Sequence, residues 1–380
     1  MSKTFVLAPD SFKESMSAID ACHAMRTGIE KIYPDARFIY KPMADGGEGT
    51  IDALLFALQG EKVAVTVTGP LSHQRIDTYF GLIDEKQTAI IEMAKANGID
   101  LLLPEQRNPL LTTTLGTGEL IKAALDHGVK KIIIGLGGSV TNDGGVGMAY
   151  ALGVRFYDQH GKNITFGGGS LHQIDKIDVS GLDTRLQHTE ILIACDVNNP
   201  LIGKNGASYV FAPQKGANAD MVELLEANMQ HYANCLSNHF KQNFHNIAGA
   251  GAAGGLSTGL LAFTNAQISA GAKTIIQEIE LEAAIAQADY VFTGEGGIDF
   301  QTQFGKTPLA VSQLAQRYQK PVFACAGYIG AEIDHLYQHG FSAIFGILDK
   351  SCDLETACQN GAKNLERTCE NIARVLKQIH

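Results

Sequence analysis

The chain has 380 residues, of which 45% are hydrophobic and 18% charged, and it carries a formal net charge of -10. This length exceeds what one ordinary core encloses, which predicts two domains, and the composition excludes an intrinsically disordered protein. The negative charge, without clusters of Lys and Arg, excludes a nucleic-acid-binding surface, although local cations and backbone N–H groups can still hold a small anion.

The cysteines and the first residues indicate the compartment in which the protein works. Seven cysteines form no C-x-x-C pair, and an odd number of this kind is typical of reduced thiols in the cytoplasm. The chain enters a strand pattern at once, so we expect no signal peptide, and no apolar stretch approaches the ~20 residues of a membrane helix. We predict a cytoplasmic protein with no membrane partner. The oligomeric state stays open between monomer and homodimer.

The first sixty residues predict two successive strand-loop-helix units. Strands are expected over 4–7 and 38–40, and helices over 15–33 and 51–58. This repetition is typical of a parallel sheet. Short turns then join the candidate strands 63–67, 76–83 and 89–93. They indicate antiparallel pairing and a second domain that begins near Thr66.

Later elements predict that the first domain resumes after a long insertion. The insertion is expected to contain a helix over 117–126, a strand over 132–134, a helix over 145–152, a strand over 190–194, a helix over 218–240 and a small-residue loop over 248–259. The α/β rhythm returns with strands over 290–293, 322–326 and 343–346, helices over 308–318 and 332–338, and a last helix from about 354. We therefore predict an α/β fold of two domains. The first is a discontinuous Rossmann-like domain with a parallel sheet, at 1–65 plus 289–380, and the second is an inserted α/β domain with a mixed sheet, at 66–288.

The glycine-rich loop over 135–147 directly follows the apolar run 132–134. Its Gly137, Gly138 and Ser139 offer backbone N–H groups with little side-chain obstruction, as a phosphate-binding loop requires. Asn142 and Asp143 could then bind a nucleotide or a metal. The alternative is a set of tight turns without a ligand.

Two further glycine-rich stretches imitate nucleotide motifs. Gly305-Lys306-Thr307 resembles the end of a P-loop, but Phe300 stands where that motif requires glycine, so we reject a P-loop. Lys306 is therefore either a phosphate ligand or a solvated charge at a helix start. Residues 249–254 satisfy the dinucleotide pattern G-x-G-x-x-G after only a weak strand, which favours a loop or a packing element.

Acidic residues recur where strands end. Carboxylates that meet at one crevice suit Mg²⁺ or a base that takes a hydroxyl proton, whereas a helix cap or an exposed turn is the alternative for each one. These residues are Asp10, Asp45, Glu48, Asp196, Glu295 and Asp299. For Lys13 and Lys215 an ordinary surface position is the alternative to a ligand role.

Six separated stretches, in order, make the chain resemble the type 1 glycerate kinases over essentially its whole length. They lie at 8–15, 42–50, 137–145, 196–201, 211–216 and 294–296. The resemblance implies two α/β domains with a central cleft, and transfer of the γ-phosphoryl group of ATP to D-glycerate with Mg²⁺. It is closest to the branch that makes 2-phosphoglycerate, with 3-phosphoglycerate as the alternative product. Gly297 departs from the family, which often has a larger polar residue there.

The matched positions suggest a role for each candidate site residue. Asp196 is expected to accept the proton of the attacking hydroxyl, and Lys13 to pair with the glycerate carboxylate and to take part in catalysis. The residues expected to bind glycerate are Asp10, Ser11, Lys13, Asp45, Gly46 and Gly47. Those expected to bind the nucleotide are Gly137, Gly138, Ser139, Asn142, Lys215, Gly294 and Glu295. Asp196 and Glu295 are the expected metal ligands.

Two other classes of protein stay open at this point. A nicotinamide-dependent oxidoreductase would use the glycine pattern over 249–254 and would bind NADH rather than ATP. A non-catalytic metabolite-binding protein would bind glycerate without ATP turnover.

Overall fold

The computed structural model describes residues 2–379, which form two compact units. Unit 1 comprises Met1–Asp45, Asp52–Gln59 and Ala272–His380, and unit 2 comprises Gly46–Ile51 and Gly60–Gly271. The units divide after Gln59 and before Ala272, whereas the predicted domain boundaries stand at 65/66 and 288/289. The predicted boundary near Thr66 falls inside β3 (Glu61–Thr68).

Unit 1 contains a five-stranded sheet in the order β13-β12-β11-β1-β2, in which all neighbours are parallel. Its strands are β1 (Thr4–Leu7), β2 (Arg37–Tyr40), β11 (Tyr290–Ile298), β12 (Val322–Ile329) and β13 (Ala343–Gly346). In the register, Phe5 of β1 is paired with Phe38 on one side and with Tyr290 on the other. Phe5, Val6 and Leu7 are wholly buried, as expected for a continuous apolar run in a parallel sheet covered on both faces.

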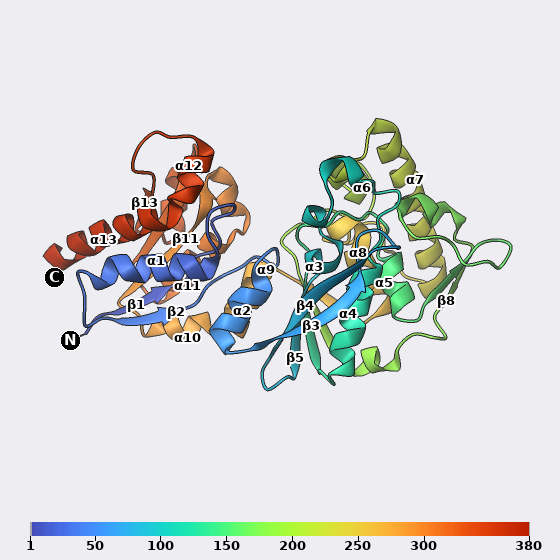
Figure 1. The fold of residues 1–380 in the computed structure, drawn as a ribbon, viewed down its shortest axis with the longest axis horizontal. Helices are drawn as coiled ribbons and strands as arrows, with labels where there is room; N and C mark the ends of the chain where they lie inside the picture. The colour runs from blue at the N-terminus through green and yellow to red at the C-terminus, as the bar shows by residue number, and fades with distance from the viewer. Residues whose placement is uncertain (1, 380) are drawn as a thin grey trace. The chain divides into compact units, whose positions relative to one another are not determined.

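The helices α1 (Ala18–Glu30) and α13 (Gly361–Ile379) lie side by side in unit 1 (Figure 1). Ser17 caps α1, because its Oγ accepts a hydrogen bond from the backbone N–H of Asp20 at 3.1 Å. A Cβ atom on Gly28 would lie 2.1 Å from the carbonyl oxygen of Glu366, so only glycine permits this close approach. Both helices pack against the aromatic and aliphatic side chains of β1.

The other helical elements of unit 1 connect or cover its strands. They are α10 (Leu281–Ala286), η6 (Phe300–Phe304), α11 (Thr307–Arg317), η7 (Asp334–His339) and α12 (Leu354–Gln359). Two further helices, α2 (Thr50–Leu58) and α9 (Gly271–Glu278), contain residues of both units.

Unit 2 contains a six-stranded mixed sheet in the order β10-β9-β6-β5-β4-β3. Its strands are β3, β4 (Arg75–Ile83), β5 (Thr88–Glu92), β6 (Lys131–Gly135), β9 (Glu190–Ala194) and β10 (Ala266–Ser269). The first three pair antiparallel, and the pairs from β5 to β10 are parallel. The predicted fold class is confirmed in both sheets, one parallel and one mixed.

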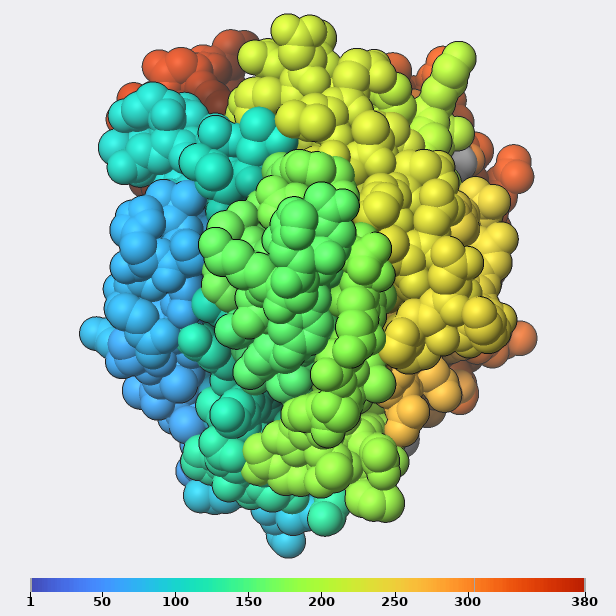
Figure 2. Space-filling model, turned by 90° about the vertical axis from the view of Figure 1, so that its right-hand side faces the viewer, coloured from blue at the N-terminus to red at the C-terminus, as the bar shows by residue number. Residues whose placement is uncertain are grey.

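Helices and a small hairpin surround the mixed sheet. The hairpin pairs β7 (Arg155–Tyr157) with β8 (Lys176–Asp178), and Figure 2 shows this part of the chain, in green, between the β3–β4 segment in blue and the α7–α8 segment in yellow. The helical elements are α3 (Ala94–Asn97), η1 (Ile99–Leu101), η2 (Pro104–Gln106), α4 (Leu115–Asp126), α5 (Val146–Ala151), η3 (Gly168–Gln173), η4 (Thr184–His188), α6 (Ala207–Phe211), η5 (Pro213–Lys215), α7 (Ala219–Phe240) and α8 (Ala252–Phe263).

The expected loop over 248–259 is wrong from Ala252 onward, because α8 begins there. Ala253, Gly254 and Gly255 have left-handed backbone angles, with φ of 52°, 65° and 86°. A Cβ atom on Gly254 would lie 2.0 Å from the carbonyl oxygen of Thr141. The small residues therefore serve a close packing of backbones, and the helix that follows them buries Leu256 and its neighbours in the core.

Among residues 2–379, no helix is both long enough and apolar enough to cross a membrane.

Candidate functional site

The carboxyl ends of β1 and β11 form the candidate site of unit 1. The chain continues from β1 to β2 on one side of the sheet and from β11 to β12 on the other, so the strand order reverses between β1 and β11. In open parallel sheets, ligands bind outside the carboxyl ends of the strands at such a reversal. Asp10 follows β1, and Glu295 lies in β11.

Asp10 is held by hydrogen bonds with three other residues, as donor to one and as acceptor from two. Its N–H donates to the carbonyl of Gly294 at 2.8 Å. Its carboxylate accepts the N–H of Ser11 at 2.6 Å through Oδ1 and the hydroxyl of Thr307 at 2.7 Å through Oδ2. Burial, together with the nearby carboxylate of Asp45, raises the pKa of Asp10 to about 6, and the Thr307 hydroxyl is the first of the groups that oppose the rise. Asp10 is thus a fixed and partly desolvated carboxylate.

Glu295 lies beside Lys306 in the same unit. Its side chain is 14% exposed, and Lys306 Nζ lies 3.4 Å from Glu295 Oε1 and 3.1 Å from the carbonyl oxygen of Gly297. Burial, together with the carboxylates of Asp10 and Asp45, raises the pKa of Glu295 to about 7, although the ammonium of Lys306 opposes the rise. The structure therefore brings three of the predicted acidic residues into one electrostatic cluster.

The loop between β1 and α1 carries Ser11 and Lys13. Ser11 is half-buried and Lys13 is exposed. A Cβ atom on Gly296 would lie 3.5 Å from the backbone N of Lys13, so this loop runs beside β11. The predicted residues Asp10, Ser11, Lys13, Gly294 and Glu295 are neighbours in unit 1.

Two other predicted acidic residues, Asp299 and Glu48, have different surroundings. Asp299 caps η6, because its Oδ1 accepts the N–H of Gln301 at 2.8 Å, which is the alternative expected for such a residue. Glu48 is exposed.

In unit 2 the glycine-rich loop over 135–147 follows β6 and contacts two other segments. Gly46 has φ of +88°, and a Cβ atom there would lie 2.6 Å from the carbonyl oxygen of Ala194 at the end of β9. A Cβ atom on Gly137 would lie 2.7 Å from Cα of Gly47. Gly138 has φ of +73°, and its carbonyl accepts the N–H of Ile99 at 2.8 Å. Glycine is required where these backbones meet.

Lys215 lies behind this loop and is only 1% exposed. Its Nζ donates to Ser139 Oγ at 2.8 Å and to the carbonyl oxygen of Thr141 at 2.7 Å. Burial lowers the pKa of Lys215 to about 7, and the nearby carboxylate of Asp143 opposes the change. The surface position considered for Lys215 is wrong.

Asn142 and Asp143 occupy the buried end of the same loop. Asp143 accepts hydrogen bonds from the N–H and hydroxyl of Thr114 and from the N–H groups of Gly145 and Gly147. Its carboxylate is thus occupied in holding the loop. Asn142 Nδ2 lies 3.2 Å from Ser208 Oγ, and Asn142 Oδ1 is buried without a hydrogen-bond partner among the described residues.

Asp196 follows β9 and is exposed. Its Oδ1 accepts the N–H of Gly271 at 2.8 Å. Unit 2 therefore contains Asp196, the predicted phosphate-binding glycines and Lys215, together with Gly46 and Gly47, which we expected to bind glycerate. Of the two expected metal ligands, Asp196 belongs to unit 2 and Glu295 to unit 1.

The oxygen ligands that the candidate residues offer can be compared with those that Mg²⁺ requires. In the part of the chain that the structure describes, no group of three or more His, Cys, Asp or Glu side chains could hold a metal ion. Mg²⁺ in kinases is bound by one or two carboxylates together with substrate phosphates and water. Single carboxylates such as Asp196 and Glu295 fit that manner of binding, and they do not fit a metal site made by protein alone.

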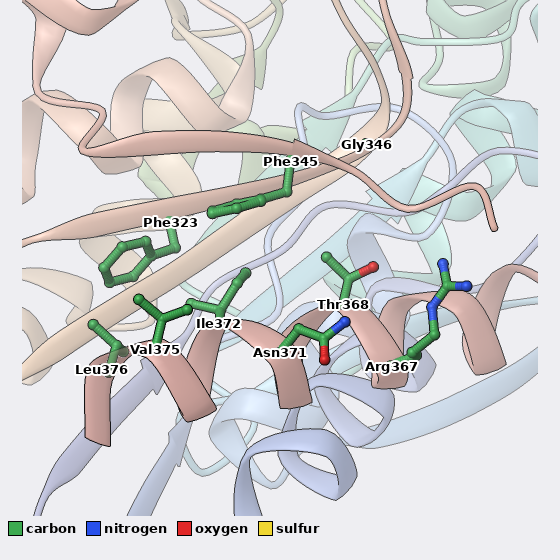
Figure 3. A pocket seen from close by; sticks show the side chains of 9 residues that line it. All are labelled: Phe323, Phe345, Gly346, Arg367, Thr368, Asn371, Ile372, Val375 and Leu376. Carbon is green, nitrogen blue, oxygen red and sulfur yellow. The ribbon is translucent and has the colours of Figure 1, made fainter. Parts of the chain in front are cut away.

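A groove of about 390 Å³ lies elsewhere in unit 1, between α13 and the strands β12 and β13 (Figure 3). Phe323 and Phe345 face Ile372, Val375 and Leu376 across it. None of the residues that line it is a predicted site residue, so it is separate from the acidic cluster.

Sequence reasoning missed Thr307 and left Lys306 undecided. Both residues reach the predicted carboxylates at the start of α11, and their only signal was the Gly-Lys-Thr run that imitates a P-loop. In this fold the 3₁₀ turn η6 stands between β11 and these residues, where a P-loop has a glycine-rich loop that joins a strand to a helix.

The chain is similar to known proteins over nearly its whole length. The family model for the glycerate kinase family matches residues 5–377. The glycerate kinase of Haemophilus influenzae is 48% identical over 372 residues, which cover 98% of each chain. The glycerate 2-kinase of Escherichia coli is 44% identical over 371 residues, which cover 98% of this chain and 97% of the relative. A crystal structure described as a glycerate kinase 2 from Salmonella typhimurium LT2 has a TM-score of 0.90 and 46% identity, and covers 100% of this chain and 99% of that chain.

Proposed function

The chain belongs to the glycerate kinase family, and from this premise we propose that it transfers the γ-phosphoryl group of ATP to the 2-hydroxyl of D-glycerate, giving 2-phosphoglycerate and ADP. The observation that carries the proposal is the near-complete coverage of curated glycerate kinases at 44% identity or more. The choice of the 2-hydroxyl is supported by the relative named glycerate 2-kinase.

Glycerate binding is assigned to the loops that carry Asp10, Ser11, Lys13, Asp45, Gly46 and Gly47. In this proposal the ammonium of Lys13 pairs with the glycerate carboxylate. The fixed carboxylate of Asp10 accepts a hydrogen bond from a hydroxyl group of glycerate. The two donors already on Asp10 support this role, because they hold its oxygens in one orientation.

Nucleotide binding is assigned to Gly137, Gly138, Ser139, Asn142, Lys215, Gly294 and Glu295. Phosphoryl transfer requires positioning and charge neutralisation more than covalent chemistry, and backbone N–H groups of a glycine loop supply both to phosphate oxygens. The unpartnered Oδ1 of buried Asn142 supports a ligand near this loop.

In this proposal Asp196 accepts the proton of the attacking hydroxyl. The catalytic Asp of protein kinases has the same role. Asp196 and Glu295 would hold Mg²⁺ through single carboxylate oxygens. When bound, Mg²⁺ neutralises charge on the phosphoryl oxygens.

An assay with ATP, Mg²⁺ and D-glycerate tests the function directly. ADP release is followed by a coupled reaction, and the product is identified by ³¹P NMR against both phosphoglycerates. We expect 2-phosphoglycerate. A 3-phosphoglycerate product would refute the position of transfer, and no glycerate-dependent ADP release by folded protein would refute the activity.

A further inference from the structure

The hydroxyl of Thr307 is aimed at one of the proposed substrate-binding carboxylates. Thr307 is 1% exposed, and its Oγ1 donates to Asp10 Oδ2 at 2.7 Å. Hydrogen bonds to a charged acceptor are shorter and stronger than those between neutral groups. The contact therefore constrains the carboxylate far more than an exposed hydroxyl would.

The local fold delivers Thr307 to this position. The 3₁₀ turn η6 follows β11 and ends at Gly305, whose φ of +106° reverses the chain. Thr307 is then the first residue of α11, and Pro308 follows it in the first turn, where its fixed φ suits a helix start. Asp10 thus accepts a hydrogen bond from a residue at the N-terminus of the eleven-residue helix α11, where the helix dipole is positive.

We propose that Thr307 is a positioning residue for glycerate, whose hydroxyl fixes the orientation of the Asp10 carboxylate. This inference rests on the proposed function, in which Asp10 binds glycerate. Thr307 acts through Asp10, and its own hydroxyl is already committed to Oδ2.

The two donors on Asp10 leave each carboxylate oxygen with remaining acceptor capacity. A carboxylate has about four acceptor sites, of which Ser11 occupies one through Oδ1 and Thr307 one through Oδ2. Without the Thr307 hydroxyl, the Ser11 bond alone, among the hydrogen bonds of the described residues, would restrain rotation of the carboxylate. Glycerate binding would then have to fix the carboxylate as well as the substrate.

The test replaces the hydroxyl of Thr307 and then restores it. Thr307→Val keeps the shape of the side chain and removes the donor, so we expect the KM for glycerate to rise about tenfold or more, with little change in the KM for ATP. Thr307→Ser restores the donor and should bring the KM for glycerate back to within a few-fold of the original.

Thr293→Val is the matched control. Thr293 is also buried in unit 1, but its hydroxyl donates to the backbone carbonyl of Ala8 at 2.8 Å rather than to a carboxylate. It should lower the unfolding midpoint to an extent similar to Thr307→Val and leave the KM for glycerate unchanged. A similar rise in both variants would show a merely structural effect and overturn the proposal.

A second measurement does not depend on turnover. The side-chain ¹³C resonance of Asp10, assigned through Asp10→Asn, reports its protonation while Asp45, Lys13, Glu295 and Lys306 remain in place. Loss of the Thr307 donor should move this titration to higher pH. An unmoved titration, or an unchanged KM for glycerate in an active Thr307→Val enzyme, overturns the inference. A wild-type protein without glycerate kinase activity would instead refute the proposed function.

Discussion

Lys215 Nζ donates to Ser139 Oγ at 2.8 Å from inside the core of unit 2, and a second bond reaches the carbonyl of Thr141. Lys215→Met removes both of these hydrogen bonds to the glycine-rich loop. We expect the KM for ATP to rise about tenfold or more, because a hydrogen bond from a charged donor contributes roughly 1.5–3 kcal/mol. Steady-state kinetics checks this, with Lys204→Met, at an exposed position, as the control. An unchanged KM for ATP would contradict the assignment.

The buried ammonium also predicts a pH dependence of stability. The pKa of Lys215 falls from 10.5 to about 7 on folding, so between these values the unfolded chain binds more protons than the folded one. Stability contributed by this residue therefore rises with pH from about 7 to 10.5 and is level below about 7. Urea unfolding of the wild type and Lys215→Met should show a difference that moves in favour of the wild type over this range, by on the order of 1–3 kcal/mol. A constant difference would be the contrary result.

Replacement by alanine should change the free energy of unfolding very differently at two glycines of β11. A Cβ atom on Gly294 would lie 2.2 Å from the carbonyl oxygen of Cys325, a backbone atom of the neighbouring strand, so Gly294→Ala should cost about 3 kcal/mol or more. A Cβ atom on Gly297 would meet only Tyr328 Cδ1, at 3.8 Å, so Gly297→Ala should change the unfolding free energy by less than about 0.5 kcal/mol. Denaturant unfolding measures both. Equal losses would show that the strand spacing is not the cause.

Asp196→Asn tests the proposed base. The amide keeps the size of the side chain and cannot take the hydroxyl proton, so kcat should fall by about 10²–10⁴. Near-normal turnover by a folded variant would exclude Asp196 from this role. Asp220→Asn, at an exposed position in α7, serves as the control.

Lys13→Met tests the proposed partner of the glycerate carboxylate. The KM for glycerate should rise about tenfold or more, because a charge-assisted hydrogen bond is lost, while the KM for ATP stays nearly constant. Lys350→Met, another exposed lysine of unit 1, is the matched control. If both variants keep the original KM for glycerate, the assignment of Lys13 is wrong.

The positions of Asp10 and Glu295 in the acidic cluster could be predicted from the sequence around each residue. Asp10 and Glu295 each follow or end an apolar run, and parallel strands bring such residues to one edge. The length of β11 could not be predicted, because its glycines imitate a loop. In the structure Glu295 is paired with Ala326 and Gly297 with Tyr328, so the strand continues to Ile298 by pairing with β12. The sequence around Glu295 does not show this pairing.

The burial of Lys215 could not be predicted for a related reason. Its acceptors lie 74 and 76 residues earlier in the chain, and an isolated lysine favours a surface position until those acceptors are known. The left-handed start of α8 could not be predicted either, because Gly254 and Gly255 pack against a loop more than a hundred residues before them.

The position of β1 between β2 and β11 has a consequence for synthesis on the ribosome. Its neighbours are β2, which is made within the next forty residues or so, and β11, which begins at Tyr290. The edge of β1 that faces β11 therefore has no partner until most of the chain has emerged, whereas the sheet of unit 2 is complete once β10 has been made. Unit 2 can fold first, and the N-terminal strand must wait with an open edge, the state in which nascent chains most need protection from aggregation.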